Sequence, residues 1–328
     1  MQTSAVLLEK PESLSLELVE LKDPGQDEVV VRVVHSGIST GTEKLLWSGA
    51  MPPFPGLGYP LVPGYEAVGE ILEAPKGASL KVGDLVFVPG SNGFVDAKGL
   101  FGGSARHLVT PVKRVTKINS EIGEKGVLYA LAATARHALT GPDAKFPDLI
   151  IGHGALGRLL ARITIIAGGK PPTVWEIDEK RTSGASGYEV LHPNDDIRND
   201  YSSVFDASGR SDLLDDWIGH CAVGAEFVLA GFYADRINFA FPQAFMREIK
   251  LRISAEWKQA DMRAVNSMVD EGHLSLDGLI TNRALAEDAA WAYRTAFEDE
   301  SCSKMVLDWG NLQSVSYTHL TLPTNRCV

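Results

Sequence analysis

The stretch Asp148-Leu-Ile-Ile-Gly-His-Gly-Ala-Leu-Gly157 decides the fold of this chain. Its first four residues, apolar after the aspartate, are typical of a buried strand. Three glycines follow with the spacing Gly-x-Gly-x-x-Gly, and residues 156–167, rich in leucine, isoleucine and alanine, predict a helix. A strand, a glycine-rich turn and a helix in this order are the context that a dinucleotide-binding motif requires.

The residues of this turn have separate expected roles. Gly152 permits the tight turn, Gly154 lets the backbone approach a pyrophosphate, and Gly157 lets the helix and the strand pack closely. Ala155 and Leu156 begin the helix, whose free N–H groups and positive dipole attract an anion. We therefore expect the pyrophosphate of a nucleotide cofactor to bind at this turn.

A second strand, expected at 173–177, supplies an acidic residue at the distance that the motif requires. Glu176 lies nineteen residues after Gly157 and should accept hydrogen bonds from the adenosine ribose. Its charge would repel a 2′-phosphate, so NAD is expected rather than NADP. Asp178 is the alternative for this role, because strand ends are read only to within a few residues. His153, inside the turn, is expected to face solvent.

The composition excludes several classes of protein. The 328 residues suggest about two domains, at roughly 150 residues each. The 31 Lys and Arg against 42 Asp and Glu give a net charge of -11, which disfavours nonspecific nucleic-acid binding and a polybasic membrane anchor. Three widely spaced cysteines without Cys-x-x-Cys spacing exclude a disulfide scaffold and disfavour a cysteine-built zinc lobe.

No targeting segment and no membrane span are expected. The first ten residues lack the basic start and the long apolar core of a signal peptide. The most apolar long stretch, 149–169, is interrupted by His153, Arg158 and Arg162, whereas a span needs about 20 mostly apolar residues. We therefore expect a soluble, cytoplasmic protein.

The pattern of the chain changes twice. The first third predicts short strands with Gly and Pro between them, as in a small barrel: 13–19, 28–34, 67–73, 85–89 and 105–110. After a helix at 127–139, strands alternate with helices, which indicates a parallel α/β sheet with strands at 148–151, 173–177, 203–207 and 226–230. Near the end, a helix at 284–297 and a strand at 303–308 are expected.

Three motifs of the β-rich part carry a resemblance: Gly37-Ile-Ser-Thr-Gly-Thr-Glu43, Pro63-Gly-Tyr-Glu-Ala-Val-Gly69 and Val82-Gly-Asp-Leu-Val86. With the nucleotide unit inserted before a returning C-terminal segment, the chain resembles the medium-chain dehydrogenase/reductase superfamily. The resemblance implies an α/β fold, in which a GroES-like β-rich catalytic domain accompanies a Rossmann domain with a doubly wound parallel sheet. We expect the catalytic domain at 1–125 and 272–313, the Rossmann domain at 126–271, and a non-native, disordered tail at 314–328.

Four longer strings, 36–47, 51–56, 58–66 and 99–103, are similar to the dehydrogenases of bacteriochlorophyll synthesis. That resemblance implies NAD-dependent oxidation of the 3-(1-hydroxyethyl) group of a bacteriochlorophyllide to 3-acetyl. The implied substrate is a chlorin that carries its own magnesium, and the protein would contact the photosynthetic membrane only transiently. Two alternatives remain: a zinc-free enone or quinone reductase, and a noncatalytic nucleotide-sensing protein.

The catalytic zinc ligands of the superfamily are missing. Its first Cys corresponds to Ser39, the His of its Gly-His-Glu motif to Tyr65, and its second Cys to Ala130, if Thr134 is the threonine that starts the following helix. A hydroxyl, a phenol and a methyl group do not form a zinc site. We therefore expect no bound metal.

Another group must then take the alcohol proton. The positions that match the superfamily's cleft are Ser39, Thr40, Lys44, Tyr65 and Glu66. Tyr65 is our first candidate, then Lys44, which would lower the pKa of the phenol, then Ser39 as a hydrogen-bond donor. The alternatives are a packing role for Tyr65, a solvated Lys44, and an ion pair for Glu66.

Three other segments carry expectations. The apolar string from Trp47 to Tyr59 either lines a site for a flat macrocycle or packs against its own barrel. Backbone near Gly231 would orient the nicotinamide carboxamide, by resemblance to the superfamily. Residues 236–241 could form a sheet edge through which two chains form a homodimer.

Overall fold

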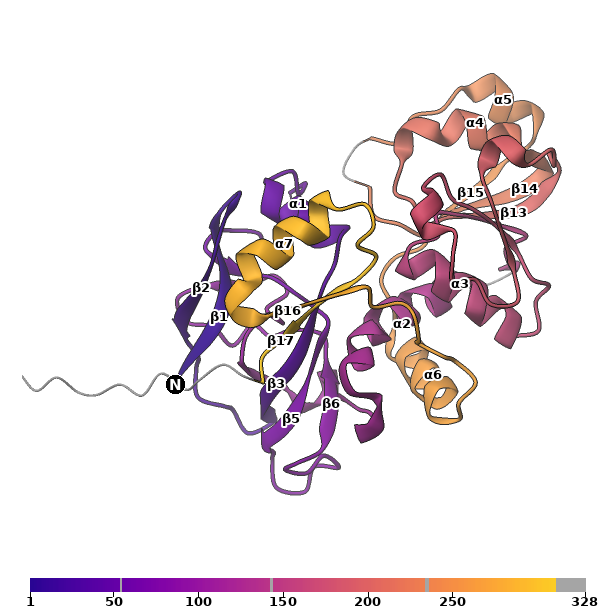
Figure 1. Ribbon diagram of the computed structural model, residues 1–328. Coiled ribbons are helices and arrows are strands. Elements are labelled where there is room, and N and C mark those ends of the chain that lie inside the picture. The colour runs from indigo at the N-terminus through magenta and orange to yellow at the C-terminus, as the bar shows by residue number, and fades with distance from the viewer. Residues whose placement is uncertain (54, 142–143, 234–235, 311–328) are drawn as a thin grey trace, which may run out of the picture.

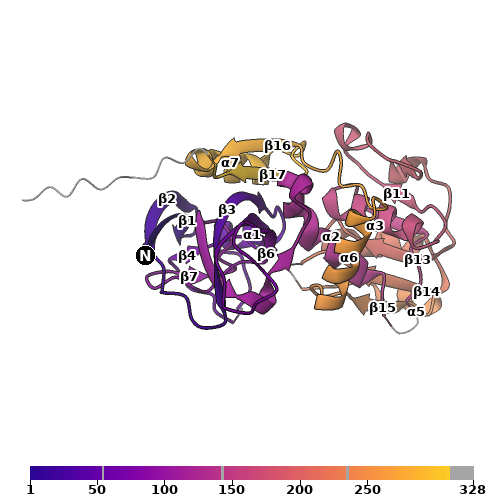
Figure 2. The same ribbon diagram turned by 90° about the horizontal axis from the view of Figure 1, so that it is seen from below.

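The computed structural model describes residues 1–53, 55–141, 144–233 and 236–310, so the expected tail at 314–328 lies outside the described residues. Two lobes lie side by side, and the C-terminal segment returns to the lobe that contains the N-terminus (Figures 1 and 2). We call the first the barrel lobe and the second the nucleotide lobe. The fold is the expected combination of a GroES-like β-rich part and a parallel Rossmann sheet.

The barrel lobe contains two sheets. Their strands are β1 (Gln2–Lys10), β2 (Ser13–Glu20), β3 (Glu28–Ile38), β4 (Leu61–Val62), β5 (Ala67–Glu73), β6 (Leu85–Val88), β7 (Lys98–Gly99), β8 (His107–Pro111), β9 (Thr116–Lys117), β16 (Asn282–Leu285) and β17 (Met305–Asp308). One sheet has the order β2-β1-β4-β7 and the other β16-β17-β3-β5-β6-β9, with β8 also paired to β3. Two helices, α1 (Thr42–Ser48) and α7 (Ala289–Glu298), complete the lobe.

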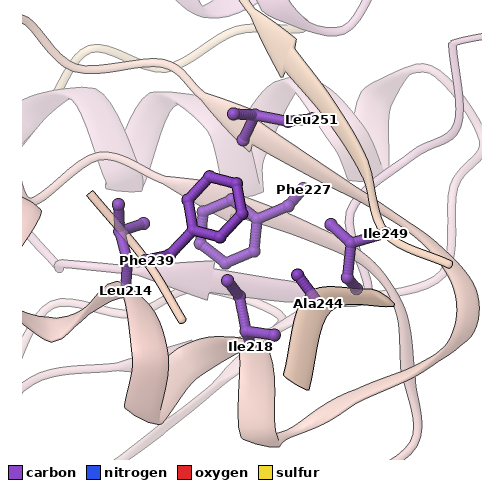
Figure 3. Close-up of a pocket in the computed structure, with 7 residues that line it drawn as sticks. All are labelled: Leu214, Ile218, Phe227, Phe239, Ala244, Ile249 and Leu251. Atoms are coloured by element: carbon purple, nitrogen blue, oxygen red, sulfur yellow. The ribbon is translucent and has the colours of Figure 1, made fainter. Parts of the chain in front are cut away.

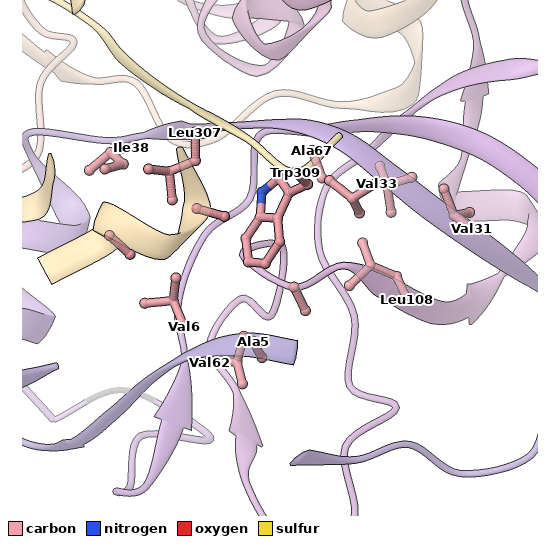
Figure 4. Packing of buried hydrophobic residues seen from close by; sticks show 14 of the residues in the cluster. Ala5, Val6, Val31, Val33, Ile38, Val62, Ala67, Leu108, Leu307 and Trp309 are labelled. Atoms are coloured by element: carbon pink, nitrogen blue, oxygen red, sulfur yellow. The ribbon is translucent and has the colours of Figure 1, made fainter. Parts of the chain in front are cut away.

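The two ends of the chain share one core in this lobe. β17 pairs with β3 in antiparallel register, from Met305 opposite Ile38 to Asp308 opposite His35. Trp309 follows β17 and is fully buried among apolar side chains of the N-terminal strands (Figure 4), and its Nε1 donates to Ser36 Oγ at 2.9 Å. The C-terminal segment is therefore an integral part of the barrel lobe.

The nucleotide lobe is a six-stranded parallel sheet with the order β12-β11-β10-β13-β14-β15. Its strands are β10 (Leu149–Ile151), β11 (Thr173–Trp175), β12 (Glu189–Leu191), β13 (Tyr201–Asp206), β14 (Cys221–Leu229) and β15 (Lys250–Ile253). Its helices are α2 (Tyr129–Ala138), α3 (Ala155–Ile166), α4 (Leu214–Gly219), α5 (Phe241–Met246) and α6 (Gln259–Asp270).

Both faces of this sheet are covered, because side chains alternate along each strand. Ile150 packs in a cluster with residues of α2, α3 and α6, whereas Leu149 and Ile151 pack with residues of α4 on the other face. The first cluster also contains Val68 and Phe87 of the barrel lobe, so it joins the two lobes.

Three expectations about elements need correction. Residues 236–241 form no strand: 236–240 are irregular and Phe241 begins α5, so the edge strand on this side of the sheet is β15. The helix expected from residue 127 begins as a 3₁₀ turn, Ser120–Leu128, and becomes α-helical at Tyr129. The helix expected from residue 284 starts later, because Asn282–Leu285 pairs with β17 as β16.

A small apolar cavity of about 40 Å³ lies at the β15 side of the nucleotide lobe (Figure 3). Its walls are formed by side chains of α4, α5, β14 and β15, among them Leu214, Phe227 and Leu251, and all seven lining residues are apolar. A space of this kind offers a ligand no polar contact, so it is a gap in packing and not the functional site. Within the part of the chain that the structure describes, no helix is both long and apolar enough to span a bilayer.

Candidate active site

The glycine-rich turn has the tight backbone geometry that is typical of a dinucleotide-binding motif. Gly152 has a φ of +94°, a conformation that residues with a Cβ rarely adopt. A Cβ on Gly157 would lie 1.8 Å from the carbonyl oxygen of Gly152, so no other residue fits at this helix–strand contact. A Cβ on Gly154, by contrast, would meet no atom within 4 Å. The open space therefore lies at the N-terminus of α3, where Ala155 and Leu156 begin the helix.

Glu176 lies directly after β11 and is almost completely buried beside this turn. Its Oε2 accepts from the N–H of His153 at 3.0 Å, and its Oε1 accepts from the N–H groups of Ile177 at 2.8 Å and Asp178 at 3.0 Å. These contacts fix the carboxylate at the carboxyl end of β11. Asp178, the alternative ribose ligand, caps a 3₁₀ turn through Lys180 N, while its Oδ2 is buried without a hydrogen bond in the described structure.

His153 is fully buried, and the expectation that it faces solvent is wrong. Its Nδ1 lies 2.6 Å from the carbonyl oxygen of Arg181, so Nδ1 carries the proton and Nε2 accepts from Tyr188 Oη at 2.9 Å. Burial lowers the pKa of His153 to about 4, so the ring is neutral at physiological pH. Arg158 donates to the carbonyls of His153 and Arg181 and so ties the β11–β12 connection to the glycine-rich turn.

The turn lies where the strand order of the sheet reverses. β10 pairs with β11 on one side and with β13 on the other, and ligands of open α/β sheets bind at such a switch point.

Asp206, at the end of β13, accepts hydrogen bonds from Ser208 and from the Tyr233 hydroxyl, and burial raises its pKa. A Cβ on Gly231 would lie 3.4 Å from Gly209 and 3.7 Å from Tyr233 Oη, so Gly231 belongs to the same cluster. The sequence contained no signal for Asp206 or Tyr233.

In the barrel lobe, the structure brings Ser39 and Tyr65 together. Ser39 follows β3, Tyr65 lies between β4 and β5, and the Tyr65 hydroxyl donates to Ser39 Oγ at 2.6 Å. Gly64 has a φ of +93°, and a Cβ there would lie 2.4 Å from Ser104 Oγ, so the chain turns at Gly64 to present the phenol. The Tyr65 ring makes an edge contact with Phe101, with ring centroids 5.5 Å apart.

The phenol of Tyr65 stays protonated at neutral pH. Burial, and next the neighbouring Glu66 carboxylate, raise its pKa well above the usual range. The expectation that Lys44 lowers this pKa is wrong, because the exposed Lys44 side chain points to α7, where its Nζ donates to the carbonyl oxygen of Phe297 at 2.9 Å. A neutral phenol donates a hydrogen bond and accepts a proton only as it passes its own proton on.

Glu66 forms a buried ion pair, as one of the alternatives predicted. Its carboxylate lies 2.7 Å and 3.0 Å from Lys304 Nζ, which also donates to the carbonyl oxygen of Ile38 at 3.2 Å. A Cβ on Gly37 would lie 2.2 Å from Glu66 Oε2, so glycine is required where β3 passes over the pair. Glu66 therefore connects the C-terminal segment to the strand that leads to Ser39.

A second buried carboxyl group, Glu43, lies next to Ser39 and was absent from our candidates. Its Oε1 accepts from Ser39 N at 2.9 Å, and its Oε2 accepts from the Tyr293 hydroxyl at 2.7 Å. Tyr293 Oη lies 3.1 Å from Ser104 Oγ. The spacing of four residues from Ser39 to Glu43 was the only sequence signal. Thr40, the remaining candidate, is exposed at the turn between them.

The donor set does not fit the superfamily's catalytic zinc. Ser39 and Tyr65 supply a hydroxyl and a phenol that bond each other, and Ala130 is a fully buried methyl group. Thr134 Oγ1 donates to the carbonyl oxygen of Ala130 at 2.9 Å. Among the described residues, no group of three His, Cys, Asp or Glu side chains is placed to hold a metal ion. Zinc requires imidazole, thiolate or carboxylate ligands, so the residues at this position do not fit it.

The apolar string from Trp47 to Tyr59 packs largely against its own lobe. Met51 is buried in a cluster with Leu46, and the Tyr59 hydroxyl donates to the carbonyl oxygen of Leu46 at 2.6 Å. Trp47 is half-buried against Phe297, with ring centroids 5.6 Å apart. Phe54, part of the same string, lies outside the described residues. The packing alternative therefore holds for Met51 and Tyr59.

The fold is shared with solved dehydrogenases. An alcohol dehydrogenase from Escherichia coli CFT073, complexed with NADH, superposes with a TM-score of 0.79 at 20% identity and covers 94% of this chain and 99% of its own. A zinc-binding dehydrogenase of Sinorhizobium meliloti 1021, bound to NADP, gives a TM-score of 0.78 at 18% identity, covering 94% and 100%. These likenesses establish the fold alone.

Sequence comparison is more specific. Residues 25–120 match the alcohol dehydrogenase GroES-like domain. The chain is 54% identical to the 2-desacetyl-2-hydroxyethyl bacteriochlorophyllide A dehydrogenase of Rhodobacter capsulatus, over 94% of this chain and 99% of the relative. It is 53% identical to the protein of the same name from Cereibacter sphaeroides, with the same coverage. The chain therefore belongs to the family of 2-desacetyl-2-hydroxyethyl bacteriochlorophyllide A dehydrogenases, within the medium-chain dehydrogenase/reductase superfamily.

Proposed function

We propose that this protein oxidises the 3-(1-hydroxyethyl) group of a bacteriochlorophyllide to 3-acetyl, a step of bacteriochlorophyll a synthesis. The observation that carries this proposal is the identity of 54% and 53% to two dehydrogenases of that name over nearly their whole length. The substrate is then a chlorin whose magnesium is held by its own ring. Because an apolar pigment partitions into a bilayer, we propose a cytoplasmic enzyme that meets the photosynthetic membrane transiently to exchange substrate and product.

We infer that the cofactor is NAD. Gly152, Gly154 and Gly157 would hold its pyrophosphate, with the N–H groups of Ala155 and Leu156, because the open space beside Gly154 lies at the N-terminus of α3. Glu176 would accept from the ribose hydroxyls, since a carboxylate has about four acceptor sites and three are used here. Its negative charge disfavours a 2′-phosphate. When bound, the nicotinamide ring accepts the hydride that leaves the carbinol carbon.

The protein's own residues would handle the proton. Gly231 backbone would orient the carboxamide, and the substrate hydroxyl would lie at Tyr65, whose phenol is bonded to Ser39. In this scheme Tyr65 Oη takes the hydroxyl proton while its own proton passes to Ser39 Oγ, 2.6 Å away, and on to solvent near the exposed Thr40. Each carbinol oxidised then yields one ketone, one hydride on the cofactor and one proton in solvent. No metal takes part in this scheme.

We further propose how the chain is divided and assembled. The catalytic domain comprises 1–125 and 272–313 and the Rossmann domain 126–271, which the pairing of β3 with β17 supports. One of the two edge strands of the six-stranded sheet, β15, is a candidate homodimer contact. Leu251 and Ile253 of β15 are exposed, as are Phe245 and Met246 of the adjacent α5. An apolar surface at an unpaired strand favours association with a second copy.

The direct test is a turnover assay with purified protein, NAD and a 3-(1-hydroxyethyl) bacteriochlorophyllide. We expect the near-ultraviolet absorbance of NADH to rise as the 3-acetyl pigment forms in equal amount, and to rise more slowly with NADP. A reaction without pigment and one with the 3-vinyl pigment, which has no carbinol, are the controls. Binding of NAD without turnover of the hydroxyethyl pigment would contradict the proposal.

A further inference from the structure

We propose that Glu43 is a positioning residue that holds the Ser39–Tyr65 pair in its reactive geometry, and that ionisation of its carboxyl group governs how turnover depends on pH. This inference rests on the proposed function, because it gives the pair a role in alcohol oxidation. It adds a residue that the zinc-binding members of the superfamily do not suggest, since Glu43 lies at none of the ligand positions.

The contacts of Glu43 join three segments that are far apart in the sequence. Glu43 is 1% exposed, and its carboxyl group accepts from Ser39 N at 2.9 Å and from Tyr293 Oη at 2.7 Å. Tyr293 comes from α7 and its hydroxyl also lies 3.1 Å from Ser104 Oγ. Since Ser39 Oγ in turn accepts from Tyr65 Oη at 2.6 Å, Glu43 fixes the residue that holds the phenol.

The charges around Glu43 leave it without a cation of its own. Lys304 is already paired with Glu66 at 2.7 Å, so two buried carboxyl groups share one buried ammonium group. The other titratable groups that face Glu43 are the phenols of Tyr293 and Tyr65, which are neutral because burial raises both pKa values. Burying a second negative charge in such surroundings is unfavourable, so a proton is readily held there.

This arrangement places the titration of Glu43 in the physiological range. Burial raises its pKa to about 7, opposed by the hydrogen bonds from Tyr293 and Ser39, and the Glu66 charge raises it further while Lys304 lowers it. Above that pH the carboxylate accepts charge-assisted hydrogen bonds from both donors, which are stronger than neutral ones. Its negative charge also favours movement of the substrate proton toward Tyr65 and Ser39. Turnover should therefore rise as pH increases through the pKa of Glu43.

The first experiment compares the pH profile of kcat/KM for the wild type, Glu43→Gln and Tyr293→Phe. Glu43→Gln keeps the size of the side chain but cannot ionise, so the rise near pH 7 should disappear and the plateau should fall about tenfold. Tyr293→Phe removes a donor that lowers the pKa of Glu43, so the rise should move to higher pH. Glu298→Gln, an exposed site on α7, is the matched control and should keep the wild-type profile.

A second experiment does not depend on turnover. Infrared spectra of the unliganded protein with labelled glutamate should show one buried carboxyl group that titrates near pH 7 and is missing in Glu43→Gln. With labelled tyrosine, the C–O band that Tyr65→Phe removes should shift over the same pH interval. If the wild type does not oxidise the hydroxyethyl pigment but both bands titrate together, the function fails while the role of Glu43 in holding the pair stands.

Three results would overturn the inference. One is a Glu43→Gln enzyme whose activity falls equally at every pH, because a purely structural carboxyl group would give that outcome. Another is a wild-type protein in which no buried glutamate titrates near neutral pH. The third is a Tyr65 band that does not respond to the titration of Glu43.

Discussion

The two lobes build their candidate sites in different ways. The nucleotide lobe uses backbone: three glycines, the N-terminus of α3, and three N–H groups that hold Glu176. The barrel lobe uses side chains: the Ser39–Tyr65 pair and the buried carboxyl groups beside it. A backbone site leaves little freedom to the sequence, whereas a side-chain site can exchange a metal for a hydrogen-bond network without altering the fold. The predictions below test this difference.

The largest effect is expected at the backbone site. Gly157→Val would place its Cβ 1.8 Å from the carbonyl oxygen of Gly152, so we expect loss of NAD binding and a fall of about 3 kcal/mol or more in the free energy of unfolding. Calorimetric titration with NAD and urea unfolding measure the two effects.

Gly154→Ala should keep the stability but weaken NAD binding, because its methyl group would enter the open space. Gly41→Ala, which also meets no atom within 4 Å, is the neutral control. Wild-type affinity in Gly154→Ala would show that the pyrophosphate lies elsewhere.

Substitutions in the side-chain site should lower the rate of turnover but leave the affinity for the cofactor unchanged. Tyr65→Phe should reduce kcat by about 10²–10⁴-fold, the contribution of positioned acid–base catalysis, while the Kd for NAD stays nearly unchanged. Lys44→Met, its control, should change kcat by less than about twofold, because the exposed Lys44 amine bonds only a carbonyl oxygen of α7 in the described structure. If Tyr65→Phe keeps most of its turnover, the phenol only packs against Phe101, and the proton route runs through Ser39 or water.

A smaller effect on cofactor affinity is expected at Glu176, a side chain beside the glycine-rich turn. Glu176→Ala should weaken NAD binding by about tenfold and narrow the difference between NAD and NADP, since it removes a charged hydrogen-bond acceptor. Asp178→Ala is the matched variant, because Asp178 is the alternative ribose ligand and its carboxylate otherwise caps a 3₁₀ turn and lies 3.8 Å from Arg181 Nε. Equilibrium titrations with both cofactors measure the change. A larger loss in Asp178→Ala, or a wild type that prefers NADP, would assign specificity to another residue.

No effect is expected from metal removal. Treatment with a chelator should leave turnover intact, and elemental analysis of the substrate-free protein should find no stoichiometric zinc, since Ser39, Tyr65 and Ala130 supply no zinc ligand set. Magnesium brought by the pigment belongs to the substrate and must be counted separately. One zinc ion per chain near Glu66 would contradict this prediction.

The sequence predicted the geometry of the glycine-rich turn well, because only glycine fits at Gly152 and Gly157 and the strand–turn–helix order is local. It predicted the side-chain site only in part. Ser39 and Tyr65 were identified from their positions in the resemblance, but nothing local indicates that Tyr293 bonds Glu43, 250 residues away in the chain. Contacts of this kind leave no periodicity or spacing to read.

Two other errors have physical causes. Residues 236–239 alternate polar and apolar side chains, but the described residues of this segment pair with no strand, and strand formation depends on a pairing neighbour more than on intrinsic preference. His153 was expected in solvent because it is polar and lies in a turn. The connection between β11 and β12 covers the His153 ring instead. Within the described residues, the only helical segment of that connection is the short 3₁₀ turn Glu179–Arg181.

The pairing of β3 with β17 also sets the order in which a nascent chain can fold. The six strands of the nucleotide sheet lie between residues 149 and 253, so they all leave the ribosome before β17 does. β3 is synthesised early, yet one of its neighbours begins only at Met305. Contacts of such long range form slowly, and an unpaired strand edge promotes aggregation. Until β17 is released, residues 35–38 of β3 lack one partner strand, so the newly made barrel lobe is incomplete at that edge.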